Sequence, residues 1–132
     1  INLFNEKNNG ETLLKLIDMG YVKTAHDVSI GGLITAVSKM CIKGNKGINL
    51  IKPKSLINEI EYYFSEDQGR YIIEVSKDNL KKVTDILNKN AVHYDELGTI
   101  IEDQLFIDEK TKVTIDELRT SNTNWLVNYM SK

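Results

Sequence analysis

Five residues near the start of a predicted helix have the types that bind phosphate or a metal ion. They are His26, Asp27, Ser29, Gly31 and Gly32. Glycines let backbone N–H groups approach a phosphate, and the helix dipole favours an anion there. Asp27 could bind a metal ion or orient His26, and the Ser29 hydroxyl could donate to a phosphate oxygen. A strand-to-helix turn capped by Ser29 or Asp27 explains the same residues, and composition alone favours it because such turns are common.

A second polar segment comes just before a strongly apolar run of residues. It contains the acids Glu66 and Asp67, the amide Gln68 and the guanidinium of Arg70. This set could bind a metal ion, ribose hydroxyls or phosphate. The alternative is a surface loop in which Glu66 or Asp67 pairs with Arg70. Taken alone, the segment favours that alternative, and such a surface pair adds little stability.

The composition excludes several classes of function. The 132 residues suit one domain with one core, and the formal net charge of −2 provides no basic surface for nucleic acid. No apolar run approaches the roughly 20 residues that span a bilayer, and the first residues do not resemble a signal peptide. We therefore expect a soluble cytoplasmic protein. The single cysteine, Cys41, lies in an apolar run and is expected to be a buried, inert thiol.

The apolar periodicity predicts helices and strands that alternate along the chain. A turn is expected at 8–10 and a loop at 26–32. Helices are expected at 11–19 with Gly20 beyond the end, at 33–41 ended by Gly44, near Ser55, after a cap at Ser76, and after a capping box of Thr114 and Glu117. Strands are expected at 21–25, 47–51, 70–75, 92–101 (which includes His93) and 104–107. This order predicts an α/β or α+β fold with helices on a mixed sheet.

The two polar segments together resemble the C-terminal domain of the aminoimidazole-ribonucleotide-synthetase superfamily. The segments are 26–33 (HDVSIGGL) and 64–70 (FSEDQGR). Within that superfamily the chain is most similar to the large subunits of formylglycinamidine ribonucleotide synthases. Residues 5–10 (NEKNNG) resemble the lead-in to this domain, and residues 115–118 (IDEL) and 124–130 (NWLVNYM) resemble the C-terminus of those subunits. The resemblance covers nearly the whole chain.

The resemblance implies a fold and a set of site residues. The fold is a three-layer α/β/α domain with a mixed sheet, partly ferredoxin-like. The chain resembles the second of two C-terminal domains in the large subunit, so residues 1–132 are expected to be one domain of a longer protein. Asp27 takes the position of a metal-binding aspartate of the first copy. Residues 66–68 take the position of a Glu-Ser-Gln triplet that contacts substrate, from which they depart at Asp67.

The resemblance also implies a reaction, cofactors and partners. Members of this group use ATP and Mg²⁺ to convert formylglycinamide ribonucleotide to formylglycinamidine ribonucleotide. Ammonia comes from a glutaminase subunit, and a small third subunit bridges the two. The working site belongs mainly to other domains of the large subunit, so no catalytic residue is assigned here and the isolated domain is expected to be inactive. The alternatives are another ATP-using member of the superfamily, or a purely structural interaction domain.

Overall fold

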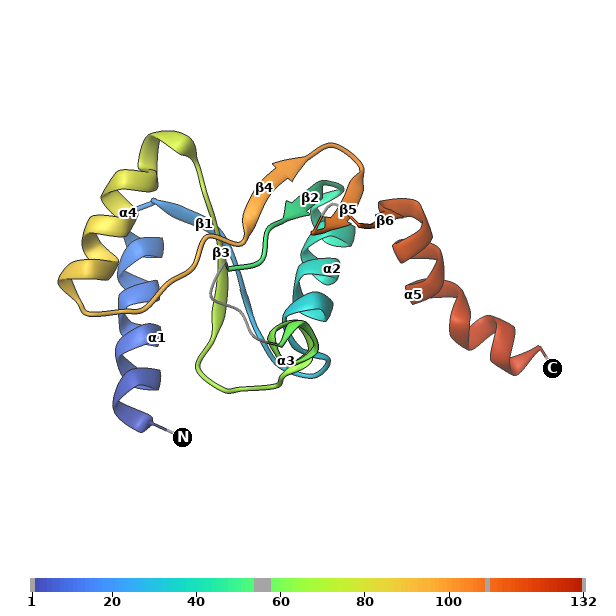
Figure 1. The fold of residues 1–132 in the computed structure, drawn as a ribbon, viewed down its shortest axis with the longest axis horizontal. Coiled ribbons are helices and arrows are strands. Elements are labelled where there is room, and N and C mark those ends of the chain that lie inside the picture. The colour runs from blue at the N-terminus through green and yellow to red at the C-terminus, as the bar shows by residue number, and fades with distance from the viewer. Residues whose placement is uncertain (1, 54–57, 109, 132) are drawn as a thin grey trace. The chain divides into compact units, whose positions relative to one another are not determined.

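The computed structural model describes residues 2–53, 58–108 and 110–131, and the chain divides into two compact units. Unit 1 comprises Ile1–Ala36 and Ile60–Asp95, and unit 2 comprises Val37–Glu59 and Glu96–Lys132. The elements in chain order (Figure 1) are α1 (Leu3–Asp18), β1 (Val22–Asp27), α2 (Gly32–Gly44), β2 (Gly47–Leu50), α3 (Glu59–Phe64), β3 (Tyr71–Val75), α4 (Lys77–Lys89), β4 (Gly98–Ile101), β5 (Gln104–Ile107), β6 (Thr111–Thr114) and α5 (Ile115–Met130). None of the helices in these described ranges is long and apolar enough to cross a membrane.

Unit 1 contains an antiparallel pair of strands, β1 and β3, and a buried apolar cluster. Val83 and Leu87 lie four residues apart on α4, so they share one face of that helix. They are buried in one cluster with Leu16 of α1 and Val22 of β1. The cluster joins elements from both ends of the unit, which explains how residues far apart in sequence form one core.

Unit 2 contains a four-stranded mixed sheet in the order β4-β2-β5-β6. Strands β2 and β5 are parallel, whereas β2–β4 and β5–β6 are antiparallel. Leu50 of β2 and Leu105 of β5 are almost fully buried. Cys41 of α2 is also buried, and burial raises the pKa of its thiol, as predicted for an inert cysteine.

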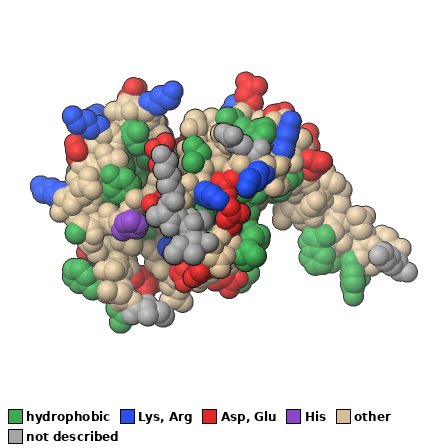
Figure 2. Space-filling model, in the orientation of Figure 1, with side chains coloured by type: hydrophobic (Ala, Val, Ile, Leu, Met, Phe, Trp, Pro, Cys, Tyr) green, Lys and Arg blue, Asp and Glu red, His purple; other side chains and the backbone are tan. Residues whose placement is uncertain are grey.

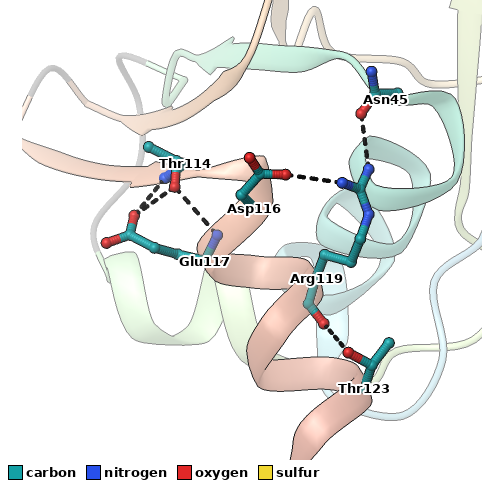
Figure 3. A network of polar contacts seen from close by, with 6 residues as sticks. All are labelled: Asn45, Thr114, Asp116, Glu117, Arg119 and Thr123. Atoms are coloured by element: carbon teal, nitrogen blue, oxygen red, sulfur yellow. Dashed lines mark hydrogen bonds and ion pairs between the residues drawn. The ribbon is translucent and has the colours of Figure 1, made fainter.

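The base of α5 is fixed by a network of polar contacts (Figure 3). The Glu117 N–H donates to Thr114 Oγ1 at 3.2 Å, and the Glu117 carboxylate accepts from the Thr114 N–H at 2.8 Å, which completes a capping box. These bonds favour the ionised carboxylate, and the backbone bond from Thr114 is the main cause of the lowered pKa of Glu117. Arg119 donates to both Asp116 and Asn45 at 2.8 Å. The first turn of α5 is therefore anchored within unit 2.

Much of the local prediction is confirmed. The structure has the predicted mixed α/β class, and the helix ended by Gly44, the strand after Gly47 and the capping box of Thr114 all form. Ser76 is the N-cap of α4, although its side chain makes no capping hydrogen bond. The predicted helix start near Ser55 lies outside the described residues.

The turn predicted at 8–10 is wrong, because α1 begins much earlier. Asn2 caps the helix by accepting hydrogen bonds from two N–H groups of the first turn. Asn8 and Asn9, which were interpreted as a turn signal, instead lie within the helix and make tertiary contacts. The side chain of Asn8 donates to the Asn90 carbonyl at 2.8 Å, and that of Asn9 to the Gly69 carbonyl at 3.0 Å.

One strand prediction also differs from the structure, and one strand was missed. The strand predicted at 92–101 forms only as Gly98–Ile101, because β2 provides partners only from Gly47 to Leu50. His93 therefore lies in an irregular segment before β4, and its side chain is exposed. Strand β6 was not predicted, although Thr111, Val113 and Thr114 are residues that favour strands.

The buried cluster of unit 1 predicts a strong contrast along α1. Leu16 is 1% exposed and Leu14 is 62% exposed. We expect Leu16→Ala to lower the free energy of unfolding by about 2–5 kcal/mol, because it leaves a cavity in the cluster. Leu14→Ala on the same helix should change it by less than about 0.5 kcal/mol. Urea unfolding followed by circular dichroism measures both, and equal effects would contradict the assignment of this core.

Candidate functional site

The two polar segments predicted from the sequence meet at one end of the β1–β3 ladder, within unit 1. His26 and Asp27 are the last residues of β1 and pair with Ile72 and Tyr71 at the start of β3. The Val28 N–H then donates to the Arg70 carbonyl at 2.9 Å. The predicted loop at 26–32 is therefore wrong for its first two residues, which belong to the strand. Antiparallel pairing of β1 with β3 thus brings the start of the first polar segment beside the end of the second.

A glycine pair connects the loop after β1 to the end of α3. Gly31 and Gly32 have φ values of +83° and +69°, which residues with a Cβ rarely adopt. The Gly31 N–H donates to the Glu66 carboxylate at 2.8 Å. A Cβ added to Gly32 would lie 2.6 Å from the Phe64 carbonyl carbon, so only glycine allows this approach. The carboxylate of Glu66 thus lies beside the first turn of α2, where the helix dipole favours a negative charge.

The segment before β3 has an internal network of its own. Ser65 Oγ donates to Asp67 Oδ2 at 2.8 Å, and Arg70 Nη2 donates to the Ser65 carbonyl at 2.5 Å and to Ser65 Oγ at 3.1 Å. Arg70 also pairs with Asp67 at 3.8 Å. The surface-loop alternative, in which Asp67 pairs with Arg70, is therefore present in the structure. Because Asp67 is mostly exposed, the pair itself adds little stability, and the guanidinium mainly fixes the loop.

A cavity of about 360 Å³ lies where these segments meet, and its lining belongs wholly to unit 1. That volume is within the range of small-molecule sites. Its polar lining residues are Glu6, Asp27, Ser29, Glu66, Gln68 and Arg70. Three carboxylates thus face one guanidinium, so the cavity is acidic overall. It favours hydroxyl donors, or a phosphate that arrives with a cation, over a free phosphate.

The structure brings together some of the predicted site residues and separates others. Five predicted residues line the cavity, namely Asp27, Ser29, Glu66, Gln68 and Arg70. Four predicted residues do not line it, namely His26, Gly31, Gly32 and Asp67. The glycines and Asp67 instead shape the loops around it. His26 Nδ1 lies 2.6 Å from the Asp27 carbonyl oxygen and 3.5 Å from its carboxylate, so these two side chains are neighbours.

Five lining residues were not predicted as site residues, and Glu6 is the charged one among them. Glu6 lies in the first turns of α1, a part of the chain that was predicted to precede the helix. The hydrogen bond from Asn9 to the Gly69 carbonyl holds this part of α1 against the loop before β3. The signal that was available is Asn2, a good N-cap residue followed four positions later by an acid in the first turn.

The predicted metal-binding role of Asp27 has limited support from its surroundings. No group of three or more His, Cys, Asp or Glu side chains among the described residues is placed to hold a metal ion. Mg²⁺ is commonly bound by one or two carboxylates together with phosphate oxygens and water. The cavity residues therefore do not fit a resident metal ion, and they fit only a cation that arrives with a nucleotide.

A family of protein domains matches most of this chain. A model described as "AIR synthase related protein, C-terminal domain" matches residues 2–109. The phosphoribosylformylglycinamidine synthase subunit PurL of Pelagibacter ubique is 67% identical over 130 residues, which is 98% of this chain and 18% of that protein. The same subunit of Bartonella quintana is 35% identical over 132 residues, 100% of this chain and again 18% of the relative. The chain therefore spans 18% of the length of these relatives.

Solved structures share the fold. Thermotoga maritima PurL complexed with FGAR has a TM-score of 0.73 and 24% identity, covering 86% of this chain and 20% of that one. The same protein complexed with ATP has a TM-score of 0.71 and 23% identity, covering 85% of this chain and 21% of that one. At this level of identity the comparison shows the fold alone.

The close approach of Gly32 to Phe64 predicts a contrast between the two ends of α2. We expect Gly32→Ala to destabilise the protein, since a strained left-handed backbone alone costs about 1–3 kcal/mol and the Cβ would also clash with backbone. Gly44→Ala is the matched control, because a Cβ there meets nothing within 4 Å and the backbone needs no positive φ. Denaturant unfolding of both variants tests this, and an undiminished stability of Gly32→Ala would contradict it.

Proposed function

The chain belongs to the AIR synthase related C-terminal domain family, and from this premise we propose that it is a domain of a phosphoribosylformylglycinamidine synthase large subunit. The observation that carries the proposal is the 67% identity to the Pelagibacter ubique subunit over 98% of this chain. Identity at that level over nearly every element supports a common role. It also supports the prediction that residues 1–132 form a C-terminal domain of a longer polypeptide.

The proposed reaction is that of the whole enzyme. It converts formylglycinamide ribonucleotide to formylglycinamidine ribonucleotide in purine biosynthesis, with ATP and Mg²⁺ as cofactors. Ammonia is supplied by a glutaminase subunit, with a small bridging subunit and the other domains of the large subunit as further partners. We place the enzyme in the cytoplasm. Within it, this chain is one domain of an ATP-dependent carbon–nitrogen ligase.

The domain alone is expected to be inactive. Phosphoryl transfer is catalysed by positioned metal ions and cationic groups around the transferred phosphate. The cavity contains one guanidinium, Arg70, and that group is already bonded to the loop at Ser65. No cluster of metal ligands accompanies it among the described residues. The residues of this chain can bind and orient a ligand, and the transferring phosphate requires groups from the rest of the subunit.

The cavity of unit 1 is proposed as an ancestral nucleotide site. The predicted set comprises His26, Asp27, Ser29, Gly31, Gly32, Glu66, Asp67, Gln68 and Arg70. Carboxylates and the Gln68 amide can bond ribose hydroxyls, while Asp27 can share a Mg²⁺ ion that arrives with the phosphates. The Nε of Arg70 is buried and has no hydrogen-bond partner among the described residues, and the guanidinium brings a positive charge to the lining of the cavity.

Two alternatives to the proposed function make different demands on the chain. Another ATP-using member of the superfamily would share the domain but not the C-terminal segment, whereas the relatives above match 98–100% of the chain, including α5. A purely structural interaction domain would expose apolar residues for its neighbours. That surface was expected at Ile1, Leu3 and Phe4 or at the aromatics 62–64. Leu3, Phe4 and Phe64 are exposed as that alternative requires, whereas Tyr63 is buried and Ile1 lies outside the described residues. The experiments below separate these functions.

A domain exchange tests the proposed function. We expect the Pelagibacter ubique subunit to keep its activity when its matching 130 residues are replaced by this chain. A rate within about tenfold of the parent corresponds to less than about 1.4 kcal/mol of lost transition-state stabilisation. The measurement is ATP hydrolysis that depends on formylglycinamide ribonucleotide and added ammonia. An exchange with the C-terminal domain of an aminoimidazole ribonucleotide synthetase is the control and should be inactive. A folded but inactive exchange with this chain would refute the proposal.

Calorimetric titration tests the nucleotide site separately. We expect ATP with Mg²⁺ to bind this chain weakly, and Asp27→Ala to remove that binding by deleting the carboxylate that shares the cation. Asp27 is largely exposed, so the variant should still fold. Asp85→Ala on α4 is the control, since it removes an exposed carboxylate that does not line the cavity. Absence of heat from the folded wild-type chain would mean that this cavity is not a nucleotide site.

A further inference from the structure

The distal part of α5 has no cover within unit 2. The first residue of the helix, Ile115, is buried, whereas every residue from 120 to 131 is exposed. The exposed residues include five large apolar side chains, namely Trp125, Leu126, Val127, Tyr129 and Met130. Trp125 is 62% exposed and Tyr129 is 71% exposed. Such a group is unusual on the surface of an isolated soluble domain.

Four of these side chains form one continuous face. Trp125, Leu126, Tyr129 and Met130 occupy positions i, i+1, i+4 and i+5, which lie on the same side of a helix. Figure 2 shows hydrophobic side chains along this helix at the right of the view. We call these four residues the α5 apolar face. Asn124 lies on the opposite side of the helix, whereas Asn128, three residues after Trp125, borders the α5 apolar face.

The composition of the segment is that of an interface. Residues 120–131 contain no charged side chain, although 27% of the whole chain is charged. Solvent-facing helices normally carry charges, whereas the centres of protein interfaces are depleted in charge and enriched in Trp, Tyr and Met. Basic residues that would attract a lipid surface are missing from this segment as well. The composition therefore favours a protein surface as the partner.

The hydrogen bonds of α5 do not provide the packing that a partner surface would give to the exposed residues. The network at Thr114, Glu117 and Arg119 fixes only the first turns (Figure 3). Beyond it, the side chains of Thr123 and Ser131 bond to carbonyls of α5 itself, at 2.9 Å and 2.7 Å. A helical stretch this short is marginally stable in water without tertiary packing. The exposed part of α5 thus requires a surface to pack against.

The parts of the chain that the family model and the relatives match indicate which protein surface covers the α5 apolar face. The domain family matches residues 2–109 and so ends before α5. The PurL relatives match 98–100% of this chain, α5 included, and the chain is only 18% of their length. The helix is therefore matched in the long relatives but lies beyond the part of the chain that the family model covers. We propose that the α5 apolar face docks into an apolar groove on another domain of the same long polypeptide, as an amphipathic helix does in a groove.

This inference rests on the proposed function only for its premise that the chain is part of a longer subunit. Its test is hydrogen exchange in the full-length subunit, which measures packing and not activity. We expect the amides of residues 120–131 to be protected in the monomeric subunit. Leu126→Asp should make them exchange at least about tenfold faster, because a charge on the α5 apolar face opens the contact. Asn124→Asp, on the opposite side of the helix, is the matched control and should leave exchange unchanged.

Each alternative occupant gives a different result. Protection that appears only when the glutaminase and bridging subunits are added would assign the face to a separate subunit and overturn the proposal. Protection that appears only as the subunit self-associates would assign it to a second copy, with the same consequence. Unprotected amides under all three conditions would mean that the face is not a docking surface. Loss of activity in the domain exchange with α5 still protected would refute the proposed function and leave this inference standing.

Discussion

The approach of Gly32 to the backbone at Phe64 is the constraint on which the candidate site depends. With a Cβ at position 32 the separation would be 2.6 Å, which backbone atoms cannot accommodate without moving. The adjacent Gly31 N–H then reaches the Glu66 carboxylate at 2.8 Å. These two contacts connect the loop after β1 to the loop before β3, and the antiparallel pairing of Asp27 with Tyr71 aligns them. The cavity exists because these segments are held together.

The charges of the cavity determine what it can bind. Glu6, Asp27 and Glu66 face a single guanidinium that is already engaged with its own loop. Such a lining suits hydroxyl donors and cation-accompanied phosphates better than a free anion. The Glu66 carboxylate also accepts the hydrogen bond of the Gly31 N–H, a donor that a phosphate would otherwise use. The lining by itself therefore lacks the cluster of positive charge that phosphoryl transfer requires.

The two units of the chain differ in what their helices α1 and α5 do with their polar and apolar side chains. In unit 1, polar residues of α1 such as Asn8 and Asn9 make tertiary hydrogen bonds, and Glu6 lines the cavity. In unit 2, the anchored base of α5 continues into an exposed helix without charged residues. A domain adapted to function alone would bury or charge that face. The exposed, uncharged face of α5 thus agrees with the proposal that the chain is one domain of a longer protein.

The sequence by itself determined the elements whose signals are local. The periodicity of α2 and α4, the capping box at Thr114 and the strand at Tyr71–Val75 depend on neighbouring residues, so they were predicted correctly. The two polar segments were also identified, together with their resemblance to a known family. Their types and order are properties of the sequence and require no knowledge of distant contacts.

Only the tertiary structure decided which of those residues share a cavity. The early start of α1 placed Glu6 in the lining, and the short partner strand β2 ended the ladder at Gly98. The start of α1 has a local signal in Asn2, but the contact of Glu6 with the other lining residues and the end of the β4 ladder depend on residues tens of positions away. The same reason separates His26 and Asp67 from the cavity while Asp27 and Gln68 remain in it. Residue types indicate the possible chemistry, and long-range packing selects the residues that can take part in it.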